Sequence, residues 1–163
     1  MVYFGQEVGE AARENAGFGS PTRTSIFDYI GVPAHQRWVN GKRYDGGALT
    51  PEEAALREYY CRLLNLPIVG AFRNIHQYNR AHTPYYNDKV YSFVRETVQE
   101  KWLVIANFSK QDGFGFELQI PPELLSTWDL PDGTYPLTDQ LYGEVPTHFH
   151  REGGYGHMRV DIA

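Results

Sequence analysis

The chain has 163 residues, of which 42% are hydrophobic, and this suits one ordinary domain or two small ones. Its formal net charge of −5 argues against a nucleic-acid partner, because such partners bind extended basic surfaces. The lone cysteine, Cys61, excludes an internal disulfide, and no apolar run approaches the roughly 20 residues of a membrane-spanning helix, so we expect no membrane partner.

The first part of the chain predicts a strand followed by a long loop. Residues 1–4 are apolar or aromatic and predict a short strand that ends at Gly5. Residues 8–47 are rich in glycine and include Pro33, so we expect a loop. Within it, residues 25–30 could form one helical turn or a short extended piece.

A helix is predicted over Pro51–Asn65. Thr50 suits the N-cap, Pro51 suits the first helical position, and Glu53 completes a capping box. Apolar residues recur at helical spacing along one face: Ala55, Leu56, Tyr59, Tyr60, Leu63 and Leu64. Pro67 disfavours helical geometry at Leu66 and so ends the helix. Cys61 lies on this helix, where we expect a buried, unreactive thiol.

From residue 67 onwards the pattern indicates strands and turns. Residues 89–96 and 101–109 predict a hairpin, and both faces of its second strand are apolar, as in the central strand of a sandwich. Residues 114–120 alternate apolar and polar side chains, which predicts one buried face. A further strand containing Pro136 is expected at a sheet edge, because proline cannot donate to the ladder.

The order of these segments resembles the carboxyl-terminal part of α-amylase-type enzymes, glycoside hydrolase family 13. "MVYFGQEVGE" resembles their last barrel strand, and "LTPEEAALREYYCRLLNL" resembles their final barrel helix. "VYSFVRE", "EKWLVIANFS" and "FELQIP" resemble the start of the sandwich that follows. The resemblance implies a mainly β chain with a short α-helical N-terminal part. Residues 1–66 would be the remnant of the last βα unit of a (β/α)8 barrel, and residues 67–163 an antiparallel Greek-key β-sandwich.

The resemblance also implies that this chain alone is inactive. Retaining glycosidases use two carboxylates about 5–5.5 Å apart, and in this family the catalytic Asp, Glu and Asp lie on earlier barrel strands. No catalytic residue, metal ligand or cofactor site can therefore be carried over to this sequence. Gln6 and Glu7, in the G-Q-E motif, are expected to support the rim of the barrel. The expected partner is an N-terminal catalytic barrel, and an exposed strand at residues 1–4 could instead pair with a second copy.

Four aromatic residues are candidates for stacking on sugar rings. Trp38 lies in the long loop, and Tyr85, Tyr86 and Trp128 lie in the β part. The competing interpretation is that Trp38 holds the loop in place and that the other three are packing residues. His148 and His150 alternate at strand spacing and would share a face with His157 nearby, but nothing in the sequence completes a metal site.

Two functions follow from these observations. The chain is expected to be the non-catalytic C-terminal portion of an α-glucan-acting hydrolase or transglycosidase, in which the sandwich covers one side of the barrel. The alternative is a stand-alone carbohydrate-binding β-sandwich that binds α-glucan. The sequence decides neither the glucan linkage nor the cellular location.

Overall fold

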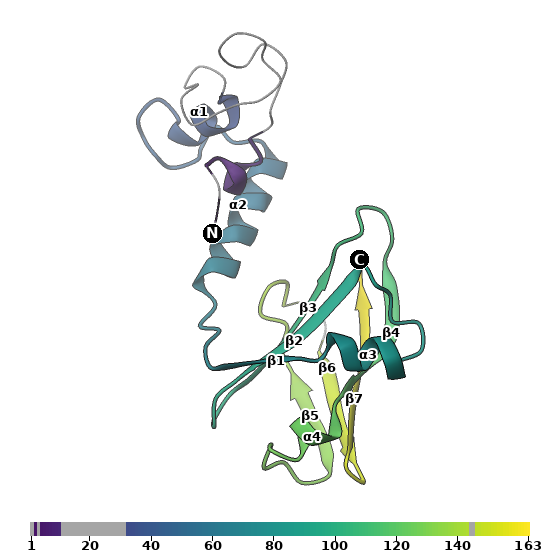
Figure 1. Cartoon of the computed structure of the whole chain (residues 1–163). Coiled ribbons are helices and arrows are strands. Elements are labelled where there is room, and N and C mark those ends of the chain that lie inside the picture. The colour runs from purple at the N-terminus through teal and green to yellow at the C-terminus, as the bar shows by residue number, and fades with distance from the viewer. Residues whose placement is uncertain (1, 3, 11–31, 144–145) are drawn as a thin grey trace. The chain divides into compact units, whose positions relative to one another are not determined.

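The protein divides into two compact units, Met1–Leu66 and Pro67–Ala163. A computed structural model describes residues 2, 4–10, 32–143 and 146–163. This part of the chain is mainly β, with two antiparallel sheets, seven strands and short helices (Figure 1). The segment 25–30, for which a helical turn or an extended piece was considered, lies outside the described residues.

The described elements of the first unit are helical. They are the 3-10 helix η1 (Gln6–Val8) and the α-helices α1 (Pro33–Val39) and α2 (Pro51–Asn65). The strand predicted at residues 1–4 is wrong for Val2 and Phe4, neither of which lies in a strand. A strand needs a hydrogen-bonded neighbour, and the described residues of this unit contain no other strand to provide one. Helix α1 corrects the loop prediction, because Pro33 occupies its first turn, where proline is tolerated.

Helix α2 begins and ends where the sequence predicts. The Glu53 backbone N–H donates to Thr50 Oγ1 at 3.3 Å, and the Thr50 N–H donates to the Glu53 carboxylate at 3.0 Å, which confirms the capping box. The helix has no buried residue, and Leu64 is 61% exposed. Cys61 is therefore exposed, and the prediction of a buried thiol is wrong.

The second unit contains two sheets. Its elements, in chain order, are β1 (Ala71–Asn74), α3 (His76–His82), β2 (Val90–Glu96), β3 (Lys101–Asn107), β4 (Phe114–Ile120), α4 (Pro122–Leu125), β5 (Gly133–Leu137), β6 (Thr147–Glu152) and β7 (Tyr155–Ile162). The strand orders are β1-β2-β3 in one sheet and β4-β7-β6-β5 in the other (Figure 1). The predicted hairpin is confirmed as β2–β3, and β5, which contains Pro136, lies at a sheet edge as expected. The prediction of a central position for β3 is wrong, because among the described strands β3 pairs only with β2 and lies at the edge of its sheet.

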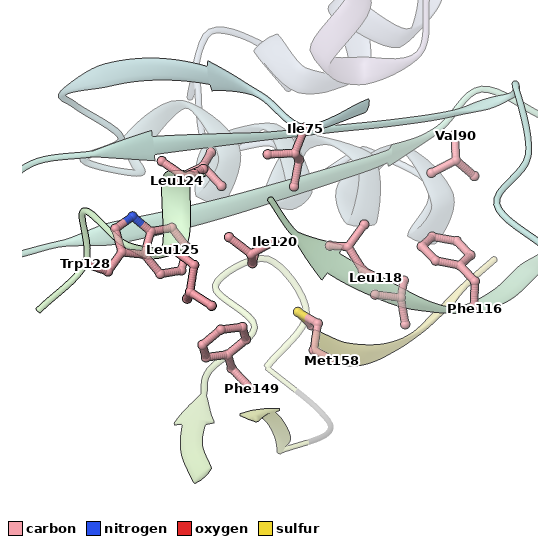
Figure 2. Packing of buried hydrophobic residues seen from close by; sticks show 12 residues of the cluster. Ile75, Val90, Phe116, Leu118, Ile120, Leu124, Leu125, Trp128, Phe149 and Met158 are labelled. Carbon is pink, nitrogen blue, oxygen red and sulfur yellow. The ribbon is translucent and has the colours of Figure 1, made fainter. Parts of the chain in front are cut away.

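A single cluster of buried apolar side chains joins the two sheets (Figure 2). Strand β2 contributes Val90 and Val94, and β4 contributes Phe116, Leu118 and Ile120. The alternation predicted for β4 is thus confirmed, since Glu117 and Gln119 point away from this core. The remaining members come from α4 and its flanks, from β6 and β7, and from the start of α3: Leu124, Leu125, Trp128, Phe149, Met158, Val160 and Ile75.

Candidate functional site

Trp38 packs inside the first unit. Its ring lies 5.7 Å from the His35 ring and 6.1 Å from the Tyr44 ring, measured between centroids. The Arg57 guanidinium lies over the indole, 4.6 Å from the ring centroid, in a cation–π contact. These contacts attach α1 and the turn after it to α2, which is the packing role considered for Trp38; a role in sugar stacking stays a prediction.

The two neighbouring tyrosines occupy different environments. Tyr85 is 87% exposed and has φ +65°, so its ring projects from a turn. The hydroxyl of Tyr86 lies 3.0 Å from His76 Nδ1 and 2.9 Å from Ser92 Oγ, and its ring contacts Phe116 edge-on. Burial raises the pKa of the Tyr86 phenol, which a hydrogen bond with Ser92 partly offsets. Tyr86 therefore packs against the core, whereas Tyr85 presents its ring to solvent.

Trp128 is part of the core and links it to a charged network. It is only 7% exposed, and its Nε1–H donates to Glu96 Oε2 at 2.7 Å. Arg73 Nε donates to the other carboxylate oxygen, Glu96 Oε1, also at 2.7 Å. We name these three residues the Glu96 clamp. It joins β1, β2 and the segment after α4, and it leaves little of the indole free to stack on a sugar.

The G-Q-E segment lies against α2. Gln6 and Glu7 belong to η1, and Arg57 Nη1 lies 4.0 Å from Glu7 Oε1. A Cβ on Gly9, just after η1, would lie 3.2 Å from the Leu56 side chain, which shows how closely the two elements approach. The expected support of a barrel rim by Gln6 and Glu7 stays a prediction.

The sheet formed by β1, β2 and β3 is aromatic on the side that faces away from the core. The register pairs Phe72 with Arg95, Arg95 with Trp102, and Phe93 with Val104, so these residues share one face. Phe72 is 48% exposed, and its ring lies 5.2 Å from that of Phe93. We call this surface the aromatic face; it comprises Phe72, Tyr91, Phe93, Arg95, Trp102 and Val104. The sequence already indicated it, because both sides of β3 are apolar.

The other sheet is polar on its outer side and carries the three histidines noted in the sequence. His148 and His150 share a face, as predicted, with ring centroids 6.3 Å apart, and His150 pairs with His157 at 5.5 Å. Within residues 2, 4–10, 32–143 and 146–163, no three His, Cys, Asp or Glu side chains are grouped so that they could hold a metal ion. The His150 and His157 rings are stacked across β6 and β7, whereas the His148 and His150 rings, both on β6, are tilted.

Two adjoining cavities lie on this polar side, with volumes of about 310 and 270 Å³. Glu117 and His157 line both of them. Glu117 is also the only carboxylate among the described residues that line either cavity. Retaining glycoside hydrolysis needs a pair of carboxylates, so neither cavity has that arrangement. In the described part of the chain, no helix is both long and apolar enough to cross a bilayer.

No protein-family model matches the chain, and no curated protein or solved structure matches it either. The likeness to α-amylase-type enzymes thus stays a prediction that rests on the order of sequence segments. The aromatic face of the second unit is rich in aromatic side chains, whereas its cavities are lined mainly by polar ones.

Proposed function

We propose that residues 67–163 form the non-catalytic sandwich of an α-amylase-type, α-glucan-acting enzyme, and that this sandwich works by covering an apolar flank of the catalytic barrel. Residues 1–66 would contribute the last βα unit of that barrel. The partner is then the catalytic barrel itself, which would hold the carboxylates that cut or transfer the glucan.

The aromatic face is the observation that carries this proposal. An outer sheet face that meets only water is normally polar, as is the side of the four-stranded sheet that holds Glu117, His150 and His157. The three-stranded sheet instead presents Phe72, Phe93 and Trp102. Arg95 lies between Phe72 and Trp102 on this face. Aromatic side chains together with arginine are enriched in surfaces that another protein covers. Removing such side chains from water favours association by roughly 25 cal/mol per Å².

Helix α2 supports the same conclusion from the first unit. It is amphipathic in sequence, yet none of its residues is buried, and Leu64 stays largely exposed. Most of the stability of a helix in a protein comes from packing its apolar face against other elements. In the proposed enzyme, that face would pack against the neighbouring elements of the barrel.

The strand order of the four-stranded sheet also supports the assignment of a Greek-key sandwich. In a Greek key, the fourth strand returns to lie beside the first of three hairpin-connected strands. The order β4-β7-β6-β5 fits this pattern when the chain is followed from β7 back to β4. The finer assignment to the family's own sandwich rests on the sequence resemblance.

A complementation experiment tests the proposal. An α-amylase-type enzyme lacking its last βα unit and its sandwich is mixed with this chain, and hydrolysis of starch is measured together with the mass of the complex by light scattering. The deleted part of the enzyme, supplied separately, is the positive control. We expect the chain alone to release no sugar and to form a complex that restores turnover.

Two variants locate the contact. Phe72→Glu places a charge on the aromatic face and should abolish the complex, whereas His148→Glu, on the polar sheet, should leave it intact. Hydrolysis of starch by the chain alone would overturn the proposal. Failure to form a complex, when the positive control does form one, would also overturn it.

A further inference from the structure

The two adjoining cavities form a groove on the outer side of the four-stranded sheet. Helix α3 forms one wall and is held to the edge strand β4 by Asn79, whose side chain bonds both the N–H and the C=O of Gln119 at 2.9 Å. Tyr78, on the same helix, lines the groove next to Gln119. Tyr155, at the start of β7, lines it as well and is 68% exposed. We call this site the tyrosine groove; it comprises Tyr78, Glu117, Gln119, Tyr155 and His157.

The Arg159 guanidinium beside the groove is already paired. Arg159 holds Asp161 through two hydrogen bonds, Nε to Oδ2 at 2.9 Å and Nη2 to Oδ1 at 2.5 Å. This bidentate pair keeps the pKa of the Asp161 carboxyl below its ordinary value. Glu117 Oε2 lies 3.9 Å from His157 Nε2. Because the Arg159 guanidinium is already paired with Asp161, it offers little attraction to a phosphate, and an uncharged ligand is favoured over an anion.

The polar atoms suit hydroxyl groups. The Glu117 carboxylate accepts hydrogen bonds, the Gln119 amide can donate and accept, and the His157 imidazole does either according to its tautomer. A sugar hydroxyl also donates and accepts, so neighbouring hydroxyls of one ring match this mixture.

The aromatic side chains suit the apolar face of a sugar ring. The Tyr78 ring is stacked on His82, with centroids 4.4 Å apart and planes 21° from parallel, so it is held in one orientation. The exposed ring of Tyr155 offers a second flat surface. Cavities of about 310 and 270 Å³ are near the lower end of the roughly 300–1,000 Å³ of small-molecule sites, which fits one ring or a short linear chain.

We propose that the tyrosine groove binds a neutral oligosaccharide, with Tyr155 and Tyr78 against the sugar rings and Glu117, Gln119 and His157 bonded to hydroxyls. This binding requires no catalytic barrel and uses the sheet opposite the aromatic face, so it stands or falls independently of the proposed docking. Only the choice of an α-1,4-linked glucan as the first probe rests on the proposed function.

The test is a titration of the whole chain with maltoheptaose, and in a second arm with cellohexaose, followed by two-dimensional NMR. In an open groove we expect roughly millimolar affinity. The Gln119 side-chain amide and the backbone of β7 should shift. Tyr155→Ala should weaken binding about three- to tenfold, whereas Tyr155→Phe, which keeps the ring, should stay within about twofold.

Tyr85→Asn is the matched control. It removes another exposed tyrosine outside the groove, and asparagine tolerates the positive φ at that position. Unchanged amide dispersion in the spectra verifies that each variant is folded. The proposed site is supported if either sugar binds the unmutated chain and Tyr85→Asn, and binds Tyr155→Ala more weakly. Absence of binding by the unmutated chain to both sugars at about ten times the expected dissociation constant would overturn it, as would binding that depends on Tyr85 and not on Tyr155.

Discussion

Replacing Glu96 with glutamine should destabilise the second unit through the Glu96 clamp. The carboxylate, whose side chain is 10% exposed, accepts one hydrogen bond from Trp128 and one from Arg73. A hydrogen bond to a charged group contributes about 1.5–3 kcal/mol, and a neutral one about 1 kcal/mol. Arg73 is 52% exposed, so solvent screens its share, and the buried bond from Trp128 dominates. Glutamine keeps an acceptor but loses the charge, so we expect a loss of about 1–2 kcal/mol.

The effect of Glu96→Gln on stability should decrease as the pH falls. Burial raises the pKa of the Glu96 carboxyl, but the hydrogen bonds from Arg73 and Trp128 outweigh burial, so the pKa lies below its ordinary value of 4.5. A carboxyl with a lowered pKa in the folded state stabilises that state above the unfolded pKa, and this stabilisation is lost as the pH falls through the folded pKa. The difference in free energy of unfolding between the unmutated chain and Glu96→Gln should therefore be largest at pH 7. It should become smaller as the pH falls from the unfolded pKa through the folded pKa of Glu96.

Urea unfolding followed by tryptophan fluorescence measures both effects. A Trp38→Phe background removes the signal of the first unit and leaves Trp102 and Trp128 in the second. Glu152→Gln, at an exposed position in β6, is the matched control and should change the free energy of unfolding by less than about 0.5 kcal/mol. Equal effects of the two substitutions at pH 7, or an effect of Glu96→Gln that is the same at about pH 3 as at pH 7, would refute the role of the clamp.

Three further predictions concern stability and reactivity. Gly70→Ala should lower the free energy of unfolding by at least about 3 kcal/mol, because a Cβ at φ +96° would lie 2.0 Å from the Glu96 carbonyl oxygen. Gly154→Ala is the control and should lower it by only about 1 kcal/mol, since Gly154 has φ +84° but open space around it. Equal melting temperatures for these two variants would contradict the prediction. Asn79→Leu should lower the free energy of unfolding by about 2–4 kcal/mol, because the fully buried Asn79 side chain bonds both the N–H and the C=O of Gln119, which would lose these partners. A loss below about 0.5 kcal/mol would show that α3 is held in another way. Cys61 should react with a thiol reagent in the native protein as fast as in urea, because it is exposed, and protection until unfolding would contradict that exposure.

Elements stabilised by neighbouring residues could be predicted from the sequence. The capping box of Thr50 and Glu53 lies within one turn, and the bounds of α2 follow from it and from Pro67. The β2–β3 hairpin and the alternation in β4 were predictable for the same reason, since side-chain periodicity is a local property.

Elements that depend on distant contacts could not be predicted. Helix α3 lacks an apolar repeat, and Asn79 attaches it to a strand some forty positions further along the chain. The burial of Trp128 could not be predicted either, because an aromatic residue in a β-rich chain can lie in the core or on the surface. Its hydrogen bond to Glu96 joins residues 32 positions apart in the sequence, so it depends on the fold. The tyrosine groove is assembled from α3, β4 and β7, which only the sheet register brings together.

The sequence predicted the part of the aromatic face that lies on β3, but not the parts on β1 and β2. The two apolar sides of β3 indicated a strand covered on both faces, and the register shows which side packs into the core and which does not. The sequence could not show that Phe72 from β1 and Phe93 from β2 extend the same patch, because their proximity depends on strand pairing.

The most direct test of the proposed function is the mass and peptide map of the native polypeptide that carries this sequence, isolated with an antibody against residues 67–163. From the proposed function we expect a polypeptide well above 18.7 kDa, with activity on starch and with peptides of a barrel that carries paired Asp and Glu residues at its strand ends. A native polypeptide of 18.7 kDa that carries no barrel peptides would contradict the proposed function.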